Sequence, residues 1–178
     1  MLTVTILAIV AFIPAMAANS LAVIFGGKFP IDGGTKIDGK RILGDGKTWS
    51  GLLGGVISAT VLGILLSFVS GSLYPSGVEG YIIILSLSLG ALLGDICSSF
   101  IKRRLGRRRG QRTPLVDEYD FVVGALLLTF IVSQTWVVET YFVNGRWMSL
   151  LVILMLIPLL HRATNIIGYR LGMKKEPW

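Results

Sequence analysis

The sequence predicts an all-α, polytopic membrane protein with five transmembrane helices, and composition, hydropathy and the placement of basic residues all indicate this fold class. Of the 178 residues, 53% are hydrophobic and only 15% are charged, and the mean hydropathy is +0.73. A soluble domain of this length normally carries more charge, so this composition indicates a chain that uses lipid as part of its solvent. We expect a single membrane-embedded domain over residues 1–178.

Five apolar stretches approach the ~20 residues that a helix needs to cross the hydrocarbon core. Their approximate ranges are 2–25, 51–70, 81–101, 121–138 and 147–167. The first stretch could instead be a cleaved signal peptide, because Ala15-Met16-Ala17 has the small-x-small form of a cleavage site. A start without basic side chains argues against that alternative.

The lysines and arginines predict the orientation in the membrane. With five spans, 16 of the 17 basic residues fall on one side, in loops at about 26–50 and 102–120 and in the C-terminal segment. The positive-inside rule then puts both loops and the C-terminus in the cytoplasm, and the N-terminus outside, in a multi-pass protein of the cell membrane. The net charge of +7 is explained by topology, so we expect membrane lipids, and no nucleic acid, as partners of these loops.

The first cytoplasmic loop is rich in glycine, with seven glycines and three aspartates between Gly26 and Thr48. Such a loop lets backbone N–H groups approach an anion closely, although a flexible connector is an alternative. Its end, Gly46-Lys47-Thr48, resembles the end of a P-loop, but the first glycine of that motif would be residue 41, which is Arg41. A basic residue and a hydroxyl near a helix N-terminus remain, and these suit phosphate oxygens.

Three aspartates follow in and after the third apolar stretch. Asp95 lies inside the stretch, where an acid is costly, and it shares a predicted helical face with Ser99 and Lys102. Asp117 and Asp120, three residues apart, can also share a face. There are structural alternatives: Asp95 could pair with Lys102 or an arginine, and the other two aspartates could cap a helix or balance nearby arginines. Together, three hard carboxylates near a glycine-rich loop favour a divalent cation, with Mg²⁺ as the best match.

A few other polar residues have no role that spacing alone assigns. Asn19, near the inner end of the first stretch, could pack against a helix or face the site. His161 and Arg162 are typical of a helix end at the membrane interface. Cys97 lies in an apolar run and is expected to be a packing residue.

These motifs resemble the membrane CTP-transferase superfamily, in which CDP-diacylglycerol synthases share G-D-x-x-x-S-x-x-K-R and a later acidic pair. The chain supplies Gly94-Asp95, Ser99, Lys102-Arg103, Asp117 and Asp120. It lacks the bacterial lysine-aspartate pair after Lys102-Arg103 and the P-G-H-G-G segment, and Glu118 stands where that pattern has arginine. The first loop is instead similar to that of the archaeal CDP-archaeol synthase family. The matching residues are Asn19, Pro30-Ile31-Asp32-x-Gly34, Asp38-Gly39-x-Arg41-x-x-Gly44 and Lys47-Thr48.

The resemblance implies five transmembrane helices and transfer of CMP from CTP to 2,3-bis-O-geranylgeranylglycerol 1-phosphate, with Mg²⁺ as cofactor and diphosphate as second product. We expect the carboxylates to hold one or two Mg²⁺ ions, Lys102, Arg103 and Ser99 to serve the phosphates, and the first loop to hold the nucleotide. The metal residues are Asp95, Asp117 and Asp120, and the loop residues are Asp38, Gly39, Arg41, Gly44, Lys47 and Thr48. Alternatives are a synthase acting on another lipid phosphate, a small cation or proton transporter and a headgroup-binding scaffold.

Overall fold

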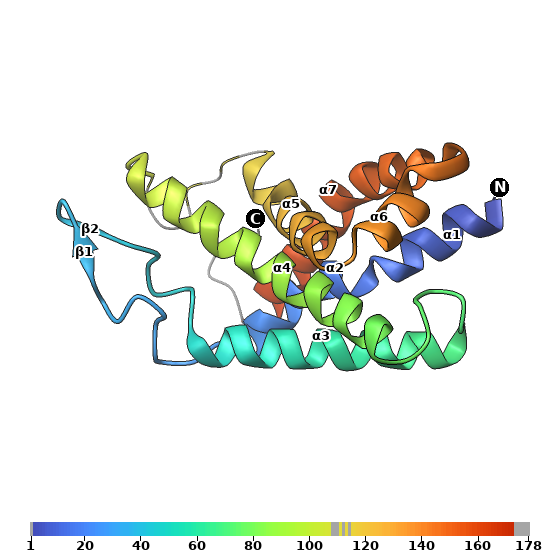
Figure 1. The fold of residues 1–178 in the computed structure, drawn as a ribbon. Coiled ribbons are helices and arrows are strands. Elements are labelled where there is room, and N and C mark those ends of the chain that lie inside the picture. Colours follow the sequence, from blue (N-terminus) through green and yellow to red (C-terminus); the bar gives the residue numbers. More distant parts are fainter. Residues whose placement is uncertain (1, 108–110, 112, 114, 173–178) are drawn as a thin grey trace.

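The computed structural model is helical apart from one small hairpin, and it describes residues 2–107, 111, 113 and 115–172, with only the backbone of His161. Arg108, Arg109, Arg112, Pro114, Lys174 and Lys175 lie outside the described residues. The elements are α1 (Leu2–Ala11), α2 (Ile13–Ile24), β1 (Lys36–Ile37), β2 (Lys40–Arg41), α3 (Trp49–Val69), α4 (Val78–Arg104), α5 (Val116–Val132), α6 (Gln134–Tyr141), the 3₁₀ turn η1 (Val143–Gly145) and α7 (Trp147–Arg170). Figure 1 shows the hairpin projecting beyond the ends of α3 and α4, while α1 and α6 lie toward the opposite end of the molecule.

Helices α1 and α2 together form the first long apolar segment, interrupted by a local break near Phe12. Pro14 lies in the first turn of α2, where its missing N–H removes no helical hydrogen bond. The combined segment Leu2–Ile24 is long and apolar enough to cross a membrane. The predicted stretch 2–25 is therefore confirmed as a candidate span.

Helix α3 packs through a stripe of small residues that recurs every fourth position. Gly51, Gly55, Ala59 and Gly63 are buried along this stripe. A β-carbon built at Gly55 would lie 2.8 Å from the Ala22 β-carbon and 3.0 Å from Leu92 Cδ1. Small residues of this kind allow helix backbones to approach closely inside a membrane, so α3 lies tightly against α2 and α4.

Helices α4 and α5 make an even closer contact through three glycines. A β-carbon at Gly94 would lie 2.3 Å from the Asp120 carbonyl oxygen, and one at Gly90 would lie 2.6 Å from the Gly124 carbonyl oxygen. Gly124 in turn faces the backbone of Gly90 and Gly94. The contact brings the first turns of α5 beside the C-terminal half of α4, so that two distant aspartate-bearing segments become neighbours.

The fourth predicted span, 121–138, is not one helix, and the prediction was wrong in its boundaries. Helix α5 starts at Val116, ends at Val132 and gives way at Ser133, which has non-helical backbone angles, to the short helix α6. The Ser133 hydroxyl donates to Glu79 Oε1 (3.2 Å), which ties the break to the start of α4. Within the described residues, four helical segments meet the length and hydropathy of a membrane span. They are Leu2–Ile24, Trp49–Val69, Val78–Arg104 and Trp147–Arg170.

An aromatic cluster holds together the end of the molecule away from the hairpin. Tyr141 donates to the Ala8 carbonyl (3.2 Å), Tyr74 to the Ala11 carbonyl (2.8 Å) and Trp136 to the Leu73 carbonyl (3.3 Å). The Tyr74 and Trp136 rings stack, and Trp136 meets Tyr141 edge-on. These bonds satisfy polar groups of the buried rings, and they connect α1, α6 and the 71–77 loop around the core.

Candidate functional site

A polar pocket of about 460 Å³ opens where the glycine-rich loop meets α2, α3 and α4. The residues that line it come from four helices and the loop, so the site exists only in the folded protein. They are Asn19, Ala22, Val23, Gly26, Gly27, Ile31, Asp45, Gly46, Lys47, Thr48, Gly51, Leu52, Leu92, Asp95, Ile96 and Asp117. We call this the polar pocket.

Two lysine–aspartate ion pairs lie at this pocket, and they connect the first loop to α4 and the end of α4 to the start of α5. Lys47 at the end of the first loop pairs with Asp95 on α4. Lys102 at the end of α4 pairs with Asp117 in the first turn of α5, at 2.6 Å. All four side chains are half-buried, so each charge is balanced by its partner while water still reaches the pair. A bound polyanion would find two cations here, and a bound cation would find two carboxylates.

The N-terminus of α3 also faces this pocket. Thr48 caps the helix: its Oγ1 accepts a hydrogen bond from the Gly51 amide (3.2 Å) and another from the Gly27 amide (3.2 Å). The cap satisfies one orphan donor of the helix start and fixes the loop entrance against α2. The positive end of the helix dipole therefore lies beside Lys47, as a phosphate site requires.

Asp120 lies on a second pocket, of about 640 Å³, between α4 and α5. Its lining is almost entirely apolar and includes Leu93, Val123, Leu127 and Ile131. We call this the apolar pocket. One Asp120 oxygen accepts from the Phe121 amide (2.7 Å). Ser98 lies beside the Asp120 carboxyl group, yet neither Asp120 Oδ2 nor the Ser98 hydroxyl makes a hydrogen bond of ordinary geometry within the described residues.

Asp117 and Asp120 therefore do not share a face in the way their spacing suggested. Residues three apart on a helix differ by about 60° in direction, and here the two side chains line different pockets. Asp117 lines the polar pocket and Asp120 the apolar one. On α4, the neighbours Gly94 and Asp95 are divided in the same manner. The charges of Asp95 and Asp120 are close enough to repel each other across this boundary.

The carboxylates offer the donor chemistry that Mg²⁺ prefers, although they do not form a finished metal cage. No group of three or more His, Cys, Asp or Glu side chains converges as a metal site among the described residues. Mg²⁺ commonly takes one or two protein carboxylates together with substrate phosphates and water. Asp95 and Asp117 on one pocket, with the unpartnered oxygen of Asp120 nearby, fit that mode of binding.

Several residues predicted to hold the nucleotide do not line the polar pocket. Asp38 and Gly39 form the tip of the β1–β2 hairpin, with positive φ angles of 51° and 73° that suit a type I′ turn. Neither residue lines the polar pocket. Ser99 is buried within α4, and the Arg103 guanidinium donates to the Arg107 carbonyl (2.8 Å) at the helix end.

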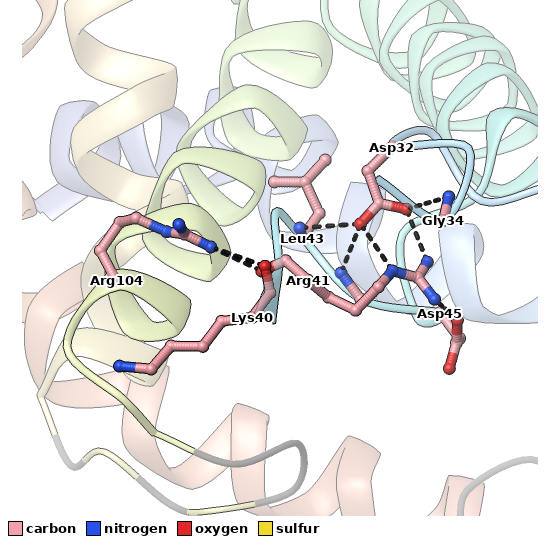
Figure 2. A network of polar contacts seen from close by, with 8 residues as sticks. Asp32, Gly34, Lys40, Arg41, Leu43, Asp45 and Arg104 are labelled. Carbon is pink, nitrogen blue, oxygen red and sulfur yellow. Dashed lines mark hydrogen bonds and ion pairs between the residues drawn. The ribbon is translucent and has the colours of Figure 1, made fainter. Parts of the chain in front are cut away.

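Arg41 and Gly44 participate in a network around Asp32, shown in Figure 2. Arg41 pairs with Asp32 and with Asp45, both at 2.6 Å, and the Gly44 amide donates to Asp32 (3.0 Å). The Arg41 guanidinium, helped by the Gly44, Leu43 and Gly34 amides, holds the pKa of Asp32 well below its usual range although burial opposes this. Sequence reasoning left Asp32 without a role, because a lone aspartate in a loop gives no sign of its partners.

Asn19 is a second residue that the sequence left unassigned. It lines the polar pocket from α2, and its Oδ1 is buried without a hydrogen-bond partner among the described residues. An amide side chain in the last turns of an otherwise apolar helix indicates a possible functional residue. The structure shows that Asn19 lies on the side of α2 that faces the polar pocket.

Comparison with known proteins decides the family. A family model described as CarS-like, CDP-archaeol synthase, matches residues 1–178. The chain belongs to the CDP-archaeol synthase family. A CDP-archaeol synthase of Methanosarcina barkeri is 44% identical over 178 residues, covering 93% of this chain and 99% of the relative. One from Methanospirillum hungatei is 46% identical, again over 93% of this chain and 99% of the relative.

A solved structure supports the fold of this family member. It is described as "Structural insight into an intramembrane enzyme for archaeal membrane lipids biosynthesis". It shares 37% identity and a TM-score of 0.70, over 89% of this chain and 92% of that chain. The prediction of a multi-pass, helical membrane protein of the CDP-archaeol synthase family is thereby confirmed.

Proposed function

We propose that the chain transfers CMP from CTP to the phosphate of 2,3-bis-O-geranylgeranylglycerol 1-phosphate, releasing diphosphate and the CDP-linked form of this unsaturated archaeal ether lipid. The observation that carries the proposal is the placement of the two pockets against the same α4–α5 pair. The polar pocket suits a nucleoside triphosphate, and the apolar pocket suits isoprenoid chains. Family membership favours this function over the transporter and scaffold alternatives.

The residues of the polar pocket would neutralise charge and align the two anions. In the structure, Lys47 and Lys102 are balanced by Asp95 and Asp117. When the triphosphate enters, the lysines would turn to its oxygens, while the N-terminus of α3 and the loop amides contact the phosphates. Positioning and charge stabilisation of this kind are the main sources of catalysis in phosphoryl-type transfer.

The reaction itself is a displacement at the α-phosphorus of CTP. An oxygen of the lipid phosphate forms a bond to that phosphorus, and the bond between it and the bridging oxygen of the diphosphate breaks. The lipid phosphate is already ionised, so no residue has to act as a general base. We infer that the reacting atoms meet at the start of α5, between Asp95, Asp117 and Asp120.

Mg²⁺ is the cofactor that this arrangement would use. Asp95 and Asp117 would hold it together with triphosphate oxygens, with Asp120 as a further carboxylate. When bound, the cation would supply the positive charge that neutralises the triphosphate and helps align it.

We further propose five spans, with the N-terminus outside and the polar pocket at the cytoplasmic face of the cell membrane. Helix α5 has 17 residues, which gives about 25 Å of length at 1.5 Å per residue, close to the ~30 Å hydrocarbon core. Helix α6 would continue the crossing after the break at Ser133. The basic loops support the orientation.

The function is tested with purified full-length protein in membranes, labelled CTP, Mg²⁺ and the ether-lipid phosphate. We expect diphosphate release that depends on the lipid phosphate, and a CDP-lipid product of matching amount. A chain that releases no diphosphate under these conditions would refute the proposal. Phosphatidic acid, offered in place of the ether lipid, distinguishes a synthase for another lipid phosphate.

A further inference from the structure

Asp32 is the centre of the first loop's polar network, although it does not line the polar pocket. Its side chain is only 1% exposed. Its two oxygens accept from Arg41 Nη2 (2.6 Å), Arg41 Nε (3.2 Å) and the amides of Leu43 (2.9 Å), Gly44 (3.0 Å) and Gly34 (3.2 Å). A buried carboxylate with this many donors stays ionised and holds its neighbours in one arrangement.

The segment held by Asp32 leads directly into the polar pocket. Leu43 and Gly44 donate to Asp32, and the next residues, Asp45, Gly46 and Lys47, line the pocket. Gly44 has a φ of +94°, a conformation that favours glycine. The backbone thus bends around the carboxylate and then presents Lys47 to Asp95.

Arg41 connects this bend to the rest of the protein. Its guanidinium bridges Asp32 and Asp45, while its carbonyl accepts from Arg104 Nη2 (2.9 Å) at the end of α4. Arg104 also donates to the carbonyls of Lys40 (3.2 Å) and Ile37 (3.1 Å). Figure 2 shows Arg104 reaching the hairpin from α4, on the opposite side of Arg41 from Asp45. The helix that carries Asp95 therefore also anchors the nucleotide loop.

We propose that Asp32 and Arg41 are positioning residues that hold the segment 43–47 in its nucleotide-binding shape. Arg41 acts through its two carboxylate partners, and not through a contact of its own with the triphosphate. This proposal deepens the proposed function and rests on it for the identity of the nucleotide. A loop with seven glycines loses much conformational entropy on ordering, and a loop ordered beforehand avoids that loss during binding.

Steady-state kinetics of the full-length protein test the proposal. Asp32→Asn and Arg41→Gln should each raise the KM for CTP about ten- to a hundredfold, as expected for a lost charged hydrogen bond. Because the reacting groups are untouched, kcat at saturating CTP should stay within about threefold. Lys36→Gln, an exposed residue of the same hairpin, is the control and should behave as wild type.

A double-mutant cycle separates positioning from direct contact. If the two residues form one unit, the KM for CTP of the double variant should be no higher than that of the more impaired single variant. Additive losses would mean that Arg41 contacts the nucleotide independently, and an unchanged KM in Asp32→Asn would mean that the network does not position the loop. Either result overturns the proposal.

Hydrogen exchange of the ligand-free protein gives a readout that does not depend on turnover. The amides of Leu43 and Gly44 should lose protection in Asp32→Asn, while amides in the α4–α5 contact keep it. Unchanged protection at Leu43 and Gly44 would refute the positioning role. If wild type releases no lipid-dependent diphosphate, the proposed function fails, and the exchange result still decides the role of Asp32 in the loop.

Discussion

Replacing Gly94 with alanine should disable catalysis more than it destabilises the fold. A β-carbon there would lie 2.3 Å from the Asp120 carbonyl oxygen, 3.0 Å from the Gly124 Cα and 3.1 Å from the Asp120 carbonyl carbon. Real β-carbons essentially never approach heavy atoms closer than 3.0 Å. All three atoms belong to backbone, so α5 has to move away from α4 by roughly 0.7 Å or more. Overpacking of this kind costs about 1–3 kcal/mol of stability.

The same movement shifts Asp117 and Asp120 relative to Asp95. A misplacement of about 1 Å can reduce turnover about a hundredfold, so we expect a kcat loss of that order. Gly90→Ala is the matched control: its β-carbon would lie 2.6 Å from the Gly124 carbonyl oxygen, in the same helix contact but one turn further from Asp95. Gly71→Ala meets nothing within 4 Å and should behave as wild type.

Diphosphate release and thermal unfolding in detergent measure the two effects. Gly94→Ala and Gly90→Ala should lose similar stability, while Gly94→Ala should lose much more activity. Wild-type kcat in Gly94→Ala would show that the close contact does not set the geometry of the three carboxylates.

Three further predictions follow from the ion pairs and the loop. Asp117→Asn and Asp120→Asn should each abolish turnover while the protein still inserts and folds. Removal of Mg²⁺ from wild type with a chelator should also abolish turnover until Mg²⁺ is restored. Activity of either variant near that of wild type would contradict the carboxylate assignment. Lys47→Gln should raise the KM for CTP about tenfold or more, as expected for a lost charged contact. Lys28 is exposed in the same loop, so Lys28→Gln should leave this KM unchanged. Equal effects of the two variants would mean that the overall charge of the loop, and not a contact of Lys47, determines CTP binding. Asp32 has a folded pKa below its ordinary value of 3.8, so its stabilisation is present above that value and is lost as the pH falls below it. The difference in unfolding free energy between wild type and Asp32→Asn should therefore stay constant from about pH 8 to 5 and shrink below about pH 4. A difference that shrinks between pH 8 and 5 would assign the effect to another group.

Hydropathy predicted the helical membrane fold well because burial in lipid depends on composition alone. The stretches 51–70 and 147–167 correspond closely to α3 and α7. The break at Ser133 was missed because it interrupts an apolar run without a proline or a charge. At the break, Ser133 has non-helical backbone angles and donates a hydrogen bond to Glu79, 54 residues earlier, a partner that local sequence does not indicate.

The sequence predicted several residues of the candidate site, but it did not predict which of them form ion pairs with one another. Asp95 was considered as a partner for Lys102 or an arginine, but it pairs with Lys47, 48 residues away. Such pairs depend on how α3 packs against α4, which the order of residues does not reveal. Asp38 and Gly39 matched a family motif, yet they form a turn whose sequence signal is the Asp-Gly pair itself.

The division of α4 and α5 between two pockets has a consequence for the routes that the substrates and products of the proposed reaction would take. One product, diphosphate, is soluble only in water and would leave through the polar pocket, whereas the CDP-lipid would move sideways into the bilayer from the apolar pocket. After each turnover the two products therefore part into different phases. Each opening would serve one substrate and one product of the same phase, so CTP would not have to enter the bilayer and the lipid would not have to leave it.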